Sequence, residues 1–152
     1  MPSWSCKHFN ELTPPELYAI LQLRNEVFVV EQQCVFQDAD DKDQYCHHLM
    51  AWIEGHLAAY TRLVPAGIAY TEISIGRVAT SSQFRKTGLG KELMSRSIEN
   101  ILALYGLNNI KIGAQLYLKN FYESFGFEQV SDIYLEDNIE HIEMILPISI
   151  GV

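Results

Sequence analysis

The segment between Ile73 and Tyr105 places the strongest constraint on the fold of this chain. Ile73 to Ala79 is apolar on both faces, which is typical of a strand in the centre of a sheet. A polar loop follows, and Gly88 to Tyr105 carries apolar residues at helical spacing before Gly106 ends the pattern. A buried strand that leads into an amphipathic helix predicts a sheet with a helix packed on its face.

Strands and helices alternate along the rest of the chain. Thr13 and Glu16 have the spacing of a capping box, so a helix is expected to begin at Pro14. Its expected apolar face is Leu17, Ile20, Leu21, Val27 and Phe28. A third helix, marked by Leu118, Phe121, Tyr122 and Phe125, is expected to end at Gly126. Further strands are expected at Trp4–Phe9, Leu49–Ile53, Leu57–Val64, Ile110–Ala114, Glu128–Leu135 and His141–Leu146, with turns at Glu54-Gly55 and Asp137-Asn138. This order predicts an α/β (α+β) fold with a mixed, mostly antiparallel sheet covered by helices.

Length and charge narrow the classes of function. The 152 residues are expected to form one domain, residues 1–152, with a hydrophobic core of its own. The net charge of −8 disfavours nucleic-acid binding, which needs a basic surface. Three cysteines without a CxxC pair, and no secretory or membrane-spanning segment, lead us to expect a cytoplasmic protein that contacts no membrane. Cys46-His47-His48 lacks the spacing of a zinc site, so no metal is expected.

The loop before the Gly88–Tyr105 helix has the properties of an anion site. The first turn of a helix leaves backbone N–H groups unpaired, and the helix dipole favours negative charge there. Gly88 and Gly90 leave the backbone accessible, while Arg85, Lys86 and Lys91 add positive charge. A P-loop and a dinucleotide fingerprint are both excluded, because Glu92 and Leu93 stand where those motifs need Ser or Thr and Gly. The sequence therefore predicts a cradle for another phosphate or pyrophosphate ligand.

Arg85-x-x-Gly88-x-Gly90 resembles the pyrophosphate-binding motif of the GNAT superfamily, the acetyl-CoA-dependent N-acyltransferases. The segment from Gln115 to Phe127 resembles the second signature of this family, a helix that ends in Tyr-x-x-x-Gly-Phe. The order of strands and helices matches over almost the whole chain. The segments 24–32 and 75–78 are similar to those of the ElaA-type branch.

This resemblance implies both a fold and a site. Two central parallel strands, Ile73–Ala79 and Ile110–Ala114, would splay apart and hold acetyl-CoA, which would be a co-substrate. The pantetheine arm would pair with the backbone near Val78, Ala79 and Thr80, and Gln115 stands where many relatives carry an asparagine. The pyrophosphate would lie on the loop and first helical turn formed by Arg85, Lys86, Thr87, Gly88, Leu89, Gly90 and Lys91. Tyr122 occupies the position of the family's general acid.

Direct acetyl transfer to an amine of a small molecule or peptide needs a base, because such an amine is protonated at neutral pH. Glu31, Glu72, His48 and His141 are the candidates, together with water. A buried core tyrosine remains the alternative interpretation of Tyr122. Arg77 lies within an apolar strand and needs an ion-pair partner or a role in acceptor binding. The four aspartates in Gln37–Gln44 either steer a cationic substrate or form a solvated loop.

Two other functions stay open at the level of sequence. The first is a non-catalytic module that binds acyl-CoA, and the second is an acyltransferase that resembles the acyl-homoserine-lactone synthases. The identity of the acceptor and the oligomeric state carry no sequence signal.

Overall fold

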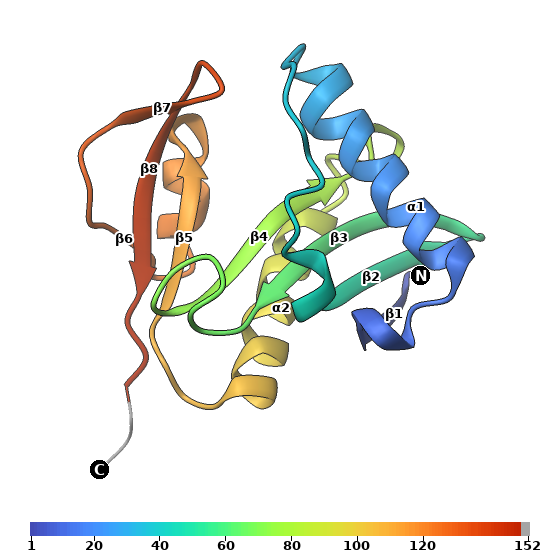
Figure 1. Ribbon diagram of the computed structural model, residues 1–152, viewed down its shortest axis with the longest axis horizontal. Coiled ribbons are helices and arrows are strands. Elements are labelled where there is room, and N and C mark those ends of the chain that lie inside the picture. The colour runs from blue at the N-terminus through green and yellow to red at the C-terminus, as the bar shows by residue number, and fades with distance from the viewer. Residues whose placement is uncertain (150–152) are drawn as a thin grey trace.

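The computed structural model describes residues 1–149. These residues form one eight-stranded sheet with helices on its faces (Figure 1). The strands are β1 (Ser3–His8), β2 (His47–Ile53), β3 (His56–Val64), β4 (Ile73–Thr80), β5 (Ile110–Gln115), β6 (Glu128–Gln129), β7 (Tyr134–Glu136) and β8 (Ile139–Leu146). The helices are α1 (Pro14–Arg24), α2 (Leu89–Tyr105) and α3 (Lys119–Glu123), with a π-helical segment at Asn25–Glu31. Short 3₁₀ turns lie at Phe9–Glu11, Asp43–Tyr45, Ser82–Phe84 and Leu116–Leu118.

The strand order is β1-β2-β3-β4-β5-β8-β6, and β7 pairs with the first residues of β8. All pairs are antiparallel except β4 and β5. These two parallel strands pair only at Ile73–Ile110 and Ser74–Lys111, and their pairing ends there. The predicted fold class is therefore confirmed, including the splayed pair of central strands.

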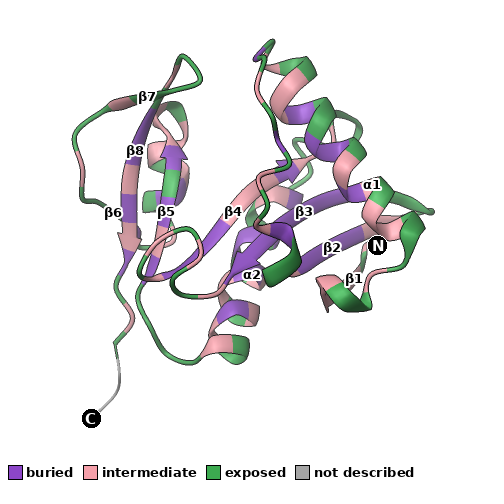
Figure 2. Cartoon of the chain, viewed as in Figure 1, coloured by how far each residue is buried: buried purple, intermediate pink, exposed green. Residues whose placement is uncertain are grey.

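Helices α1 and α2 pack on opposite faces of the sheet. Ile20 and Leu23 of α1 contact a cluster that contains Met50 and Tyr60, whereas Leu89 and Leu93 of α2 pack with Leu49. This alternation along β2 places successive side chains in two separate cores. Figure 2 shows β2 and β3 buried along most of their length, while the tip between β7 and β8 is exposed.

The predicted turns and the first helix cap are confirmed. The Thr13 hydroxyl accepts a hydrogen bond from the Glu16 amide, and the Glu16 carboxylate accepts one from the Thr13 amide. The residues of both hairpin turns have positive φ angles, 48° and 80° at Glu54-Gly55 and 51° and 63° at Asp137-Asn138. Such angles match the twist of two-residue hairpins, so these turns set the register of their strands.

Two expected elements differ in the structure. The strand expected over Glu128–Leu135 is divided into β6 and β7, and between them the Ser131 hydroxyl, in place of a backbone carbonyl, accepts a hydrogen bond from the Glu143 amide of β8. The first helix ends at Arg24 and continues as the π-helical segment. The buried residues Ile20, Leu23, Arg24 and Val27 follow regular helical spacing, whereas the predicted Leu21 is only half-buried.

The interpretation of the aspartate run as a solvated or steering loop was wrong. Asp38, Asp40 and Asp43 form ion pairs with three arginines, and Arg24 and Asp38 are buried. Arg24 lies 2.7 Å from Asp38 and 2.7 Å from Asp43. Arg62 donates to both oxygens of Asp40, at 2.8 and 2.9 Å. The network therefore fixes the segment 37–44 against α1 and the sheet.

Burial alone would raise the pKa of the Asp40 carboxyl, but the Arg62 hydrogen bonds and the nearby positive charges lower it to about 2. The same balance with Arg24 and Arg62 lowers the pKa of Asp43. Both aspartates are therefore ionised at neutral pH, and their charges pair with the arginines.

We expect Arg24→Met to destabilise the fold strongly, because Asp38 and Asp43 would lose a buried cationic partner. Breaking a buried ion pair typically costs about 3–5 kcal/mol, which should lower the melting temperature by roughly 10 °C. Lys7→Met is the matched control, because the Lys7–Glu16 pair is partly exposed and such pairs contribute about 1 kcal/mol or less. Calorimetry that gave equal melting temperatures for the two variants would contradict a structural role of the network.

Candidate active site

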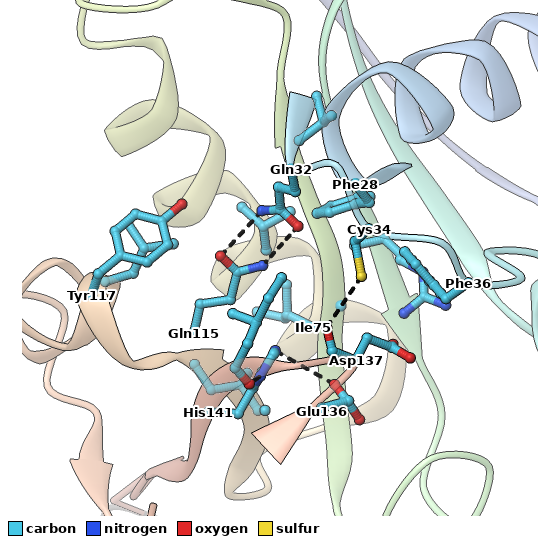
Figure 3. Close-up of a pocket in the computed structure, with 18 of the residues that line it drawn as sticks. Phe28, Gln32, Cys34, Phe36, Ile75, Gln115, Tyr117, Glu136, Asp137 and His141 are labelled. Atoms are coloured by element: carbon cyan, nitrogen blue, oxygen red, sulfur yellow. Dashed lines mark hydrogen bonds and ion pairs between the residues drawn. The ribbon is translucent and has the colours of Figure 1, made fainter. Parts of the chain in front are cut away.

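The divergence of β4 and β5 opens a cavity of about 310 Å³, which we call the V cavity. Ile75 to Val78 line it from β4, and Ile112, Gly113 and Gln115 line it from β5. The π-helical segment contributes Val27 and Phe28, and Phe36 directly precedes the segment 37–44 that the ion network fixes. Figure 3 shows these side chains together with residues of the β7–β8 hairpin.

A β-bulge in β4 shapes one wall of this cavity. Arg77 and Val78 together lie opposite Thr61, because Tyr60 pairs with Ala79 and Arg62 pairs with Gly76. Arg77 has a φ of 51°, which is unusual for a residue with a side chain. Its guanidinium donates to Asp38 at 2.8 Å, so an ion pair holds the bulge. The expected ion-pair partner of Arg77 is therefore Asp38, and the arginine also lines the V cavity.

A second cavity of about 390 Å³, the cradle groove, runs from the start of α2 to Tyr122. Thr80, Arg85 and Gly90 line its outer end, and Val78 lines its inner end. Gly88 caps α2 with a φ of 83°, and a Cβ atom built there would meet no atom within 4 Å. This end of the groove is therefore an open helix N-terminus of the kind that accommodates anions.

The other predicted cradle residues occupy two environments. Lys86, Thr87 and Lys91 are exposed around the helix N-terminus. The side chains of Ala79 and Leu89 are buried in the core. These two residues can therefore serve a ligand only through their backbone.

Arg85 is less available than the sequence indicated. Its guanidinium makes two hydrogen bonds with the carboxylate of Glu31, at 2.7 and 2.9 Å, and donates to the Thr80 carbonyl at 3.0 Å. Glu31 therefore neutralises this arginine, and the pair connects the π-helical segment to the cradle loop.

Tyr122 lines both cavities. It is 5% exposed, and its ring packs edge-on against Phe121 and Phe127. Burial raises the pKa of its phenol, and the neighbouring Tyr117 adds to the shift, so Tyr122 is protonated at neutral pH. No hydrogen bond from the described part of the chain contributes to that shift.

Gln32 and Gln115 pair with each other in the lining of the V cavity, and Gln32 also lines the cradle groove. Each amide donates to the other, with N–O distances of 3.2 and 3.3 Å (Figure 3). Gln115 was predicted from the sequence as a binding residue, whereas Gln32 was not, although it lies in the segment 24–32. A ligand that contacts Gln115 through its side-chain amide competes with this pair.

Three of the four candidate bases lie outside the V cavity. His48 is buried between the Tyr60 hydroxyl and the Asp43 carbonyl, and burial lowers its pKa to about 4. Glu72 lines other cavities at the opposite end of β4. Glu31 lines the cradle groove and is paired with Arg85.

His141 is the candidate that lines the V cavity together with Tyr122. It lies opposite Gln115 in the pairing of β5 and β8. Its Nε2 atom is 3.5 Å from a carboxylate oxygen of Glu136, which also lines the cavity.

The splayed pair of central strands beside the start of α2 is the arrangement that the resemblance to the GNAT fold implies. Comparison with known families agrees: residues 16–148 match the family described as an acetyltransferase (GNAT) domain. The chain belongs to the GNAT acetyltransferases.

Within this family the chain is similar to ElaA proteins. It is 40% identical over 146 residues to protein ElaA of Escherichia coli strain K12, covering 95% of each chain. The crystal structure of E. coli ElaA superposes with a TM-score of 0.90 at 39% identity, covering 95% of this chain and 99% of that one. The crystal structure of an acyl-CoA N-acyltransferase from Pseudomonas aeruginosa superposes with a TM-score of 0.91 at 45% identity, with the same coverage. Both predicted resemblances, to the GNAT superfamily and to its ElaA-type branch, are confirmed.

Among residues 1–149, no helix has the length and apolar character needed to cross a membrane. The cytoplasmic location expected from the sequence stays a prediction.

Proposed function

We propose that this protein transfers an acetyl group directly from acetyl-CoA to the amine of a small molecule or peptide. The observation that carries the proposal is the junction of the two cavities at Tyr122. Acetyl-CoA would occupy the cradle groove with its pyrophosphate at the start of α2, and the amine would reach the thioester from the V cavity. The related P. aeruginosa structure is described as an acyl-CoA N-acyltransferase, which supports this class of donor.

The chemistry assigns a task to each group at the junction. The amine attacks the thioester carbon, the C–N bond forms, and the C–S bond then breaks. We assign stabilisation of the oxyanion to a backbone N–H of β4. Tyr122, protonated at neutral pH, gives a proton to the departing CoA sulfur.

Acetyl-CoA should stabilise the folded protein if this assignment is right. A ligand at a hundred times its dissociation constant contributes about 2.7 kcal/mol to the free energy of unfolding. For a domain of this size that corresponds to a rise of roughly 5–10 °C in melting temperature. Differential scanning fluorimetry with acetyl-CoA, and with pantetheine as a control that lacks the pyrophosphate, measures this effect. A flat melting temperature at millimolar acetyl-CoA would contradict the proposed donor.

The non-catalytic alternative predicts the same stabilisation without turnover. An assay for CoA thiol release with a panel of primary amines separates the two functions. Suitable members are phenethylamine, spermidine, glycinamide and a peptide with a free amino terminus. The third function, with a long acyl chain, requires an apolar tunnel. The V cavity instead carries Asp40, Arg77, Glu136 and His141 among its lining residues, which favours a polar acceptor.

A further inference from the structure

We propose that His141 is the general base that deprotonates the acceptor amine, and that Glu136 binds the incoming ammonium group beside it. This assignment rests on the proposed acetyl transfer and deepens it by naming the residue that takes the proton. It also predicts that the acceptor enters as a cation. Four observations carry the assignment: the tautomer of the imidazole, the position of Glu136, the cavity that both residues line, and the placement of the other candidates.

The tautomer follows from a hydrogen bond. His141 Nδ1 lies 2.8 Å from the carbonyl oxygen of Ile139. A carbonyl oxygen only accepts hydrogen bonds, so Nδ1 must carry the proton. In the neutral ring Nε2 is then the unprotonated nitrogen with a free lone pair. The ring is also stacked on Tyr134, with centroids 5.9 Å apart, so its orientation is fixed.

Glu136 and the Nε2 lone pair together can bind an ammonium group. The carboxylate oxygen of Glu136 lies 3.5 Å from Nε2, and both atoms are hydrogen-bond acceptors while the ring is neutral. Two acceptors at this separation form a site for a group that donates to both, and a primary ammonium has three N–H donors. When Nε2 takes a proton from that group, the imidazolium that forms is stabilised by the same carboxylate.

The burial of His141 and Glu136 and the charges around them suit an acceptor bound in the V cavity. His141 is 7% exposed, whereas the Glu136 side chain is 63% exposed. A proton taken by the buried ring can therefore leave to solvent past Glu136. The other titratable or charged groups that line the V cavity around His141 are Cys34, Asp40, Arg77, Tyr117, Tyr122 and Asp137. Asp40 and Arg77 are held in the ion network, so Glu136 and Asp137 are the acidic groups left to face a cation.

The proton balance is complete without another reactant. The ammonium loses one proton to His141 Nε2, and that proton passes to solvent. The neutral nitrogen then attacks the thioester carbon, and the C–S bond breaks. The sulfur takes a proton from Tyr122, and the second proton lost by the nitrogen restores the phenol. The products are the amide and CoA thiol, with one net proton released.

The test is His141→Asn, because the asparagine Nδ2 takes the place of the imidazole Nδ1 and keeps the donor for the Ile139 carbonyl. The variant lacks only the Nε2 acceptor and part of the ring. Single-turnover acetyl transfer should be measured across a pH series with saturating acetyl-CoA and the best amine of the panel named above. His56→Asn, at an exposed histidine that begins β3, is the matched control.

We expect His141→Asn to slow the transfer about a hundredfold at neutral pH, the lower part of the usual range for a positioned base. The melting-temperature rise with acetyl-CoA should persist in this variant. Glu136→Gln should raise the KM of a cationic amine about tenfold and change kcat less.

A folded His141→Asn variant with the wild-type rate and pH profile would overturn the assignment of His141 while leaving acetyl transfer intact. A wild-type protein that acetylates no amine would overturn the proposed function and the assignment with it. The two failures are therefore distinguishable within one experiment.

Discussion

Replacing Tyr122 with Phe should slow acetyl transfer by roughly 10²–10⁴, the range typical of losing a positioned acid. The variant removes one oxygen and keeps the ring that packs against Phe121 and Phe127. Because no hydrogen bond from the described residues contributes to the pKa of this phenol, stability should change by less than about 1 kcal/mol. Single-turnover transfer at saturating acetyl-CoA is the right measurement, since product release can limit steady-state rates and hide the effect.

Tyr105→Phe provides the control for this prediction. Its hydroxyl is hydrogen-bonded to His47 at 3.0 Å and lies outside both cavities, so its loss should lower stability by about 1 kcal/mol and leave transfer unchanged. The opposite pattern, with Tyr122→Phe fully active and destabilised, would make Tyr122 a core residue.

Gly88→Val should weaken acetyl-CoA binding by at least a hundredfold. Gly88 opens α2 with a φ of 83°, and a Cβ atom there would project into open space at the helix N-terminus. The valine side chain would fill the volume that the pyrophosphate needs, and it would also strain the loop that presents the amides. Isothermal calorimetry with acetyl-CoA measures the loss.

Backbone strain alone must be separated from this effect. Gly67 has a φ of 88° and likewise has no atom within 4 Å of a built Cβ, but it lies outside the cradle groove. Gly67→Val therefore carries a similar conformational cost, about 1–3 kcal/mol, without obstructing the groove. If both variants lose stability equally and Gly88→Val still binds acetyl-CoA with wild-type affinity, the pyrophosphate does not bind at the start of α2.

Local patterns in the sequence were enough to predict most of the secondary structure. Periodicity of two or 3.6 residues reports which face of an element is buried, and the turn residues at 54–55 and 137–138 adopt the backbone that their types favour. One exception was the strand expected over Glu128–Leu135. At its interruption a side chain, Ser131, accepts the Glu143 amide proton, and a contact across two strands leaves no trace in local spacing.

The sequence contains enough information to predict the ion network of the aspartate run. Arg24, Arg62 and Arg77 all lie beside apolar residues in the sequence, and guanidinium groups that become buried or partly buried require carboxylate partners. The aspartates between 38 and 43 are the densest source of them in the chain. Considered together, the arginines beside apolar residues and the run of aspartates predict an ion network rather than a solvated loop.

Part of the candidate site could be predicted from the sequence. The cradle and Tyr122 lie in continuous motifs, so their resemblance to a family is visible in the sequence. The choice among four possible bases was not, because it depends on which side chains the splayed strands, the π-helical segment and the β7–β8 hairpin bring around one cavity. Gln32 was missed for the same reason, since its partner Gln115 is 83 residues away.

The most direct test of the proposed function is product analysis of a single turnover. Wild-type protein in excess over acetyl-CoA should be mixed with each amine of the panel, and both products quantified by mass spectrometry. We predict one N-acetylated amine and one CoA thiol per acetyl-CoA consumed, with at least one amine of the panel, and a much slower reaction with Tyr122→Phe. Acetyl-CoA that remains intact with every amine, although it binds the protein, would contradict the account and favour a non-catalytic acyl-CoA-binding module.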